Sequence, residues 1–86
     1  MTNERNRGGG TRVTLAAGTA AATDVVVAGM TAQDELISVL SFTTAAAIAS
    51  VADRTGEYAC QAGGLDKAAG TNEAANQLLI IWNHFV

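Results

Sequence analysis

The segment Leu78-Leu79-Ile80-Ile81-Trp82 places five large apolar side chains in succession. Successive side chains of a β-strand point to opposite faces, so a strand formed by this segment is apolar on both faces. Such a strand has to be covered on both sides. We expect one alternating set, either Leu78, Ile80 and Trp82 or Leu79 and Ile81, to pack on the chain's own core. The other set then faces a neighbouring subunit.

A chain of 86 residues offers little cover for this segment, because 18 of its 42 hydrophobic residues are alanines that bury little apolar area. Domains of this size are only marginally stable without disulfides, metals or oligomerisation. Cys60 is a single cysteine, and with His84 it falls short of the ligands of a zinc site. We expect no cofactor and no metal. We expect a homo-oligomer, with a trimer favoured over a dimer.

Charge is unevenly distributed along the chain. Residues 1–12 carry three arginines and one glutamate, a charge of +2, whereas residues 13–86 carry a charge of −5. An acidic body argues against a nucleic-acid partner, because affinity for phosphates comes from clustered lysine and arginine. Residues 1–10 end in three glycines, which predicts a flexible N-terminal arm followed by a single domain over residues 11–86.

No run approaches the roughly 18 apolar residues of a membrane span. The first residues lead into no apolar segment of the kind found in secretory signals. We expect a protein made in a cytoplasm, without a membrane partner.

Several short segments have strand patterns. Residues 11–16 and 57–62 alternate, residues 25–28 are β-branched, and residues 77–82 form the last strand. Tyr58 and Cys60 are expected to face the core. Short strands separated by turn signals predict an all-β fold, a small β-sandwich or barrel-like domain.

Residues 31–42 fit two structures. Thr31 with Asp34 resembles a helix capping box, but the segment ends in strand-favouring residues and we favour a strand. In that strand one face carries Leu36, Ser38, Leu40 and Phe42, and the other carries Ile37 and Val39.

The remaining segments are predicted to connect these strands. Residues 44–52 are rich in alanine and predict a loop with at most one helical turn, and residues 53–56 a turn. Residues 63–76 are small and polar, which indicates a long surface loop with a short strand around Leu65.

No catalytic constellation stands out, and we do not expect an enzyme. His84 lacks a neighbouring nucleophile or orienting acid in the sequence, and Cys60 has no electropositive neighbours to lower its pKa. Trp82 fits a core or interface anchor better than a platform for a sugar or base. We expect the scattered acidic side chains to be charged groups exposed to solvent. They are Asp34, Glu35, Asp53, Glu57 and Asp66.

Four stretches resemble, in their order, the small virion proteins of tailed bacteriophages. They are Asp24-Val25-Val26-Val27-Ala28-Gly29-Met30, then Asp34-Glu35-Leu36-Ile37-Ser38-Val39-Leu40-Ser41-Phe42-Thr43-Thr44, then Asp53-Arg54-Thr55-Gly56-Glu57-Tyr58, and finally Asn76-Gln77-Leu78-Leu79-Ile80-Ile81-Trp82. Such chains are β-rich and look like capsid decoration or cement proteins.

The resemblance implies a structural protein on the outer surface of the virion capsid. It would bind the major capsid protein and clamp neighbouring capsid subunits. The alternatives are a phage tail or head-fibre component, and a soluble β-sandwich module that binds a ligand or glycan. The candidate interface residues are Leu79, Ile81, Trp82, Phe85 and Val86, with Arg5, Arg7 and Arg12 as a second attachment.

Overall fold

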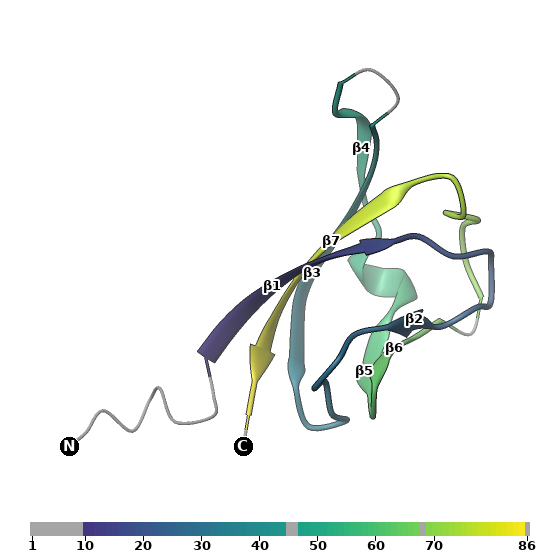
Figure 1. The fold of residues 1–86 in the computed structure, drawn as a ribbon. Helices are drawn as coiled ribbons and strands as arrows, with labels where there is room; N and C mark the ends of the chain where they lie inside the picture. The colour runs from purple at the N-terminus through teal and green to yellow at the C-terminus, as the bar shows by residue number, and fades with distance from the viewer. Residues whose placement is uncertain (1–9, 45–46, 68, 86) are drawn as a thin grey trace.

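The computed structural model describes residues 10–44, 47–67 and 69–85. Within these ranges the chain is all-β, as predicted, and carries one short 3-10 helix (Figure 1). The elements are β1 (Gly10–Ala17), β2 (Val25–Val26), β3 (Glu35–Thr43), β4 (Ala49–Asp53), η2 (Thr55–Glu57), β5 (Ala59–Gln61), β6 (Gly64–Asp66) and β7 (Gln77–His84).

The strands form two antiparallel sheets. Sheet A has the order β1-β7-β3-β4, and sheet B has the order β2-β6-β5. The apolar strand β7 lies inside sheet A, between the first strand and β3, where both of its edges are paired. The early and late parts of the chain therefore close the same sheet, and the start of β1 lies beside the end of β7 (Figure 1).

The core lies between the two sheets. From β7, Leu78, Ile80 and Trp82 are buried, whereas Leu79 and Ile81 on the opposite face are half-buried. The structure thus selects the first of the two sets. The core cluster consists of Val25, Val27, Met30, Val39, Tyr58, Leu65, Leu78, Ile80 and Trp82, with Ala16, Leu36 and Cys60 packed against it. The predicted inward positions of Tyr58 and Cys60 are confirmed.

Residues 31–42 contain a strand rather than a helix. The capping-box pair forms a turn instead, in which the Thr31 N–H donates to Asp34 Oδ2 at 2.8 Å and the Asp34 N–H to the Thr31 carbonyl at 3.1 Å. Strand β3 starts at the next residue, Glu35, which pairs with Asn83 of β7.

The predicted faces of β3 are wrong beyond Leu36. A register shift between Leu36 and Ser38 leaves Ile37 without a partner in β7, as in a β-bulge. The extra residue reverses the alternation, so Leu36 and Val39 both pack on the core. Ile37 is 46% exposed.

The predicted loop over residues 44–52 is also wrong in its second half. Residues 49–53 form β4, which pairs with β3 through Ala49 opposite Thr43 and Ala52 opposite Ser41. Pairing with β3 overrides the helix propensity of alanine. The turn predicted at residues 53–56 overlaps the 3-10 helix η2, and the short strand predicted around Leu65 is β6.

Candidate functional site

The side of sheet A that faces away from sheet B carries large apolar side chains. In the register, Val13 lies opposite Ile81, and Leu79 lies between Leu15 on one side and Leu40 on the other. Val13 and Leu15 are each 64% exposed, and Leu40, Leu79 and Ile81 are half-buried by their neighbours. We call this surface the outer face and define it by Val13, Leu15, Ile37, Leu40, Leu79 and Ile81.

Polar residues border the outer face. At one end, a row across three strands joins Thr11, Asn83 and Glu35. The Thr11 hydroxyl donates to Asn83 Oδ1 at 2.8 Å, and Asn83 Nδ2 donates to Glu35 Oε1 at 2.9 Å. At the β4 side, Asp53 pairs with Leu40. An apolar centre with a polar rim is the usual anatomy of a protein interface.

A second cluster fixes the end of β7. The Asp34 side chain is fully buried and accepts the backbone N–H of Phe85 at 2.9 Å. His84 Nδ1 lies 3.0 Å from Asp34 Oδ2, and the His84 ring meets the Trp82 ring edge-on at 5.7 Å between centroids. Phe85 follows directly and is 52% exposed. Its ring is therefore presented to solvent from a backbone that Asp34 holds in place.

The carboxyl group of Asp34 stays ionised despite its burial. Burial raises its pKa, but the N–H groups of Phe85 and Thr31 and the side chain of His84 hydrogen-bond the charged form and lower the pKa to about 2. The prediction that this carboxylate is exposed to solvent is therefore wrong for Asp34. This carboxylate is a structural clamp between the turn at residues 31–34 and the end of β7.

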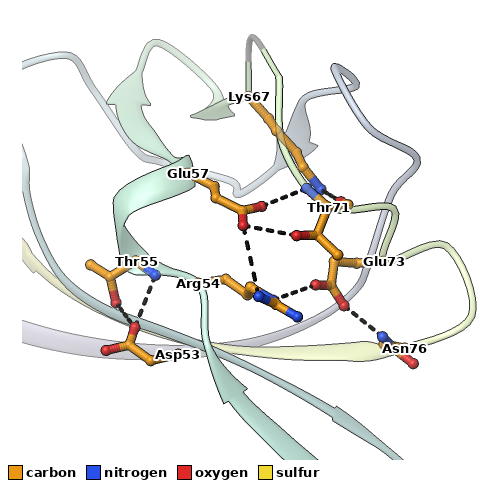
Figure 2. Close-up of polar contacts among 8 residues, drawn as sticks. All are labelled: Asp53, Arg54, Thr55, Glu57, Lys67, Thr71, Glu73 and Asn76. Atoms are coloured by element: carbon orange, nitrogen blue, oxygen red, sulfur yellow. Dashed lines mark hydrogen bonds and ion pairs between the residues drawn. The ribbon is translucent and has the colours of Figure 1, made fainter.

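A third polar cluster lies between η2 and the segment that precedes β7 (Figure 2). The buried Glu73 side chain receives Arg54 Nε on Oε2 at 2.8 Å and Asn76 Nδ2 on Oε1 at 2.5 Å. Burial raises the pKa of Glu73, but hydrogen bonds from Asn76, Ser41 and Arg54 outweigh it and lower the pKa below its ordinary value.

Glu57 ties the same region to the loop after β6. Its two carboxylate oxygens accept the N–H of Thr71 at 2.8 Å and the Thr71 hydroxyl at 2.9 Å, and the N–H donation in particular lowers the pKa of Glu57 (Figure 2). Lys67 is buried, donates to the Thr71 carbonyl and lies 5.1 Å above the Tyr58 ring. Glu57 therefore also differs from the predicted solvated carboxylate, because its carboxylate oxygens bind Thr71. These contacts hold a long loop in place.

The chemistry available at these clusters is structural. Burial, and secondarily the negative charge of Asp34, raises the pKa of the Cys60 thiol, the opposite of what activates a cysteine nucleophile. His84 does have an orienting acid, Asp34, which sequence reasoning missed because the two lie 50 residues apart. Among the described residues there is no group of three metal-ligating side chains and no pocket.

The predicted interface residues have different surroundings. Trp82 is 1% exposed, and its indole is not available to stack on a sugar or to meet a partner. Arg12 lies over the Trp82 ring at 5.8 Å, on the core side of β1. Leu79 and Ile81 lie on the outer face, and Phe85 is exposed beyond β7. Arg5, Arg7 and Val86 lie outside the described residues.

Four of the six outer-face residues were not among the predicted interface residues: Val13, Leu15, Ile37 and Leu40. Val13 and Leu15 carried a signal, since they alternate with polar residues in β1, but only the pairing with β7 shows which side they take.

In the part of the chain that the structure describes, no helix is long and apolar enough to cross a membrane. Comparisons with protein-family models, curated proteins and solved structures gave no match.

Proposed function

We propose that this chain is a structural virion protein, a decoration protein that binds the outer surface of a phage head and stabilises the shell by bridging capsid subunits. The observation that carries the proposal is the pairing of Gly10 with His84. It places the start of β1 beside the end of β7 (Figure 1), and Phe85, which follows β7, is exposed. Phe85 is the proposed attachment point at this end, and the basic residues of the N-terminal sequence, Arg5 and Arg7, are the proposed second attachment.

Phe85 is suited to act as an anchor. Its N–H is fixed by Asp34, so an aromatic ring that is 52% exposed sits on an ordered backbone. A side chain that is already positioned loses less conformational entropy on binding. Buried aromatic anchors commonly carry much of the energy of an interface.

The charge distribution supports a defined orientation on the shell. Residues 1–12 carry +2 and residues 13–86 carry −5, so an acidic capsid surface would attract the first segment and repel the body. A decoration protein of this size does not need a large interface, because many copies on one shell act together. The strand and turn order described above resembles that of phage decoration proteins and supports the same role.

The proposal is tested by mixing the purified protein with expanded heads that lack it and measuring co-sedimentation. We expect saturable binding at hundreds of copies per head, and we expect Phe85→Ala to weaken binding at least about tenfold. Val26→Ala is the matched control, because Val26 is 83% exposed on β2 of the other sheet. It should bind as the unmodified chain does.

Absence of binding to heads would contradict the proposal. Binding at only a few copies per particle would instead indicate the tail or head-fibre component. Equal binding of Phe85→Ala and the unmodified chain would remove Phe85 from the attachment surface.

A further inference from the structure

Strand β1 carries its large apolar side chains on the side away from the core. Val13 and Leu15 belong to the outer face, whereas Arg12 and Thr14 share the inner side with Trp82 and Ile80. An antiparallel sheet with one solvated face ordinarily has apolar residues inward and polar residues outward. β1 has the reverse pattern, and β7 is apolar on both faces. Sheet A therefore has the residue pattern of a sheet that is buried on both sides.

We infer that the outer face of sheet A binds the outer face of a second copy of this chain. The inference does not depend on a phage head, because it concerns the contact between copies in solution.

The absence of charge on the outer face favours a second copy over a charged partner as the occupant. The six residues that define the outer face are all uncharged, and the nearest acids, Glu35 and Asp53, lie on its rim. The body as a whole carries −5 over residues 13–86. Two outer faces can meet without burying a carboxylate, whereas a basic partner would have to desolvate cations against an apolar surface that offers them no counter-charge.

The area of the outer face indicates how strongly two copies should bind each other. The three strands that carry it, spaced about 4.8 Å apart, and seven residues of about 3.4 Å each cover roughly 340 Å². Two such faces give roughly 690 Å², below the ~1,000 Å² expected of a stable specific interface and in the range of weak, transient contacts. The contact between copies is therefore weak and reversible, and it depends on protein concentration.

The test is sedimentation velocity of the full chain over a wide concentration range, without heads. We expect a reversible shift from monomer to oligomer. Leu15→Glu on β1 and Ile37→Glu on β3 should each raise the dissociation constant by at least about 100-fold, because each buries an unpaired carboxylate in every copy. Val26→Glu adds the same charge at an exposed valine outside the outer face and should associate almost as well as the unmodified chain. Circular dichroism confirms that each variant is folded.

Salt provides a second readout. The copies carry like charge, so added salt should strengthen association through apolar faces. A chain that stays monomeric at every concentration would overturn the inference. Loss of association in Leu15→Glu but not in Ile37→Glu would also overturn it, because the contact would then lie at the free edge of β1. Equal loss in Val26→Glu would show that the effect comes from net charge and not from the outer face.

Discussion

The indole N–H of Trp82 donates a hydrogen bond to the hydroxyl of Thr14 at 3.1 Å, joining β7 to β1 across 68 residues of sequence. Trp82 is among the largest fully buried side chains, so its N–H needs a partner inside the protein. This explains why a small polar residue occupies the inner side of β1. The larger apolar residues of that strand, Val13 and Leu15, lie on the outer face.

Thr14→Val tests this link. Valine has nearly the same shape and suits a strand, but it leaves the indole N–H buried without an acceptor, and we expect a loss of about 1–3 kcal/mol in the free energy of unfolding. The measurement is urea unfolding followed by Trp82 fluorescence. Thr11→Val is the control, because the Thr11 hydroxyl bonds Asn83 at an exposed site. Equal effects of the two substitutions would argue against the role of the indole contact.

Arg54→Met removes the cation that Glu73 faces. The buried carboxylate would keep Asn76 as a donor but lose its charged partner (Figure 2). Breaking a buried ion pair costs about 3–5 kcal/mol, and we expect the lower part of that range because the Arg54 side chain is 32% exposed. Chemical denaturation measures the change. A loss below about 1 kcal/mol would mean that Glu73 is held well enough by its neutral donors.

Because the folded protein favours the ionised form of Asp34, we expect the protein to lose stability in acid. Its pKa is about 2 in the folded protein against an ordinary value of 3.8, so the folded state favours the ionised form. This contribution is fully present above about pH 4 and is lost as the pH falls toward 2. Asp34→Asn should be less stable than the unmodified chain at pH 7, and the difference should shrink between pH 4 and pH 2. A difference that stays constant over that range would contradict the clamp.

Gly64→Ala probes the packing of sheet B. A Cβ at Gly64 would collide with the backbone carbonyl of Val25 in the neighbouring strand, whereas a Cβ at Gly56 meets nothing within 4 Å. We expect Gly64→Ala to cost about 1–3 kcal/mol or more, because a backbone atom cannot move aside as a side chain does. Gly56→Ala should be close to neutral. Thermal unfolding compares the two, and similar melting temperatures would contradict the close approach.

Local patterns in the sequence predict much of this fold. The all-β class, the inward positions of Tyr58 and Cys60, the short strand at Leu65 and the two possible sets in β7 follow from alternation and turn residues. The faces of β3 do not, because one extra residue at Ile37 reverses the alternation and leaves no mark in composition. β4 was missed because its alanines favour a helix and only the neighbouring β3 makes them a strand.

The candidate site was harder to predict than the fold. The outer face joins residues from β1, β3 and β7, and their common side depends on the register between these strands. The clamps of Asp34 with His84 and of Arg54 with Glu73 also join residues far apart in sequence. Single-residue chemistry gives no sign of such partners, which is why the sequence predicts a solvated carboxylate at Asp34, where the structure has a buried one.

The most direct test of the proposed role is cryo-electron microscopy of expanded heads incubated with the full chain. We expect added density in many symmetry-related copies on the outer surface, with the end that holds Gly10 and Phe85 against the shell. Heads without added density, or density confined to the tail or to a few sites, would contradict it.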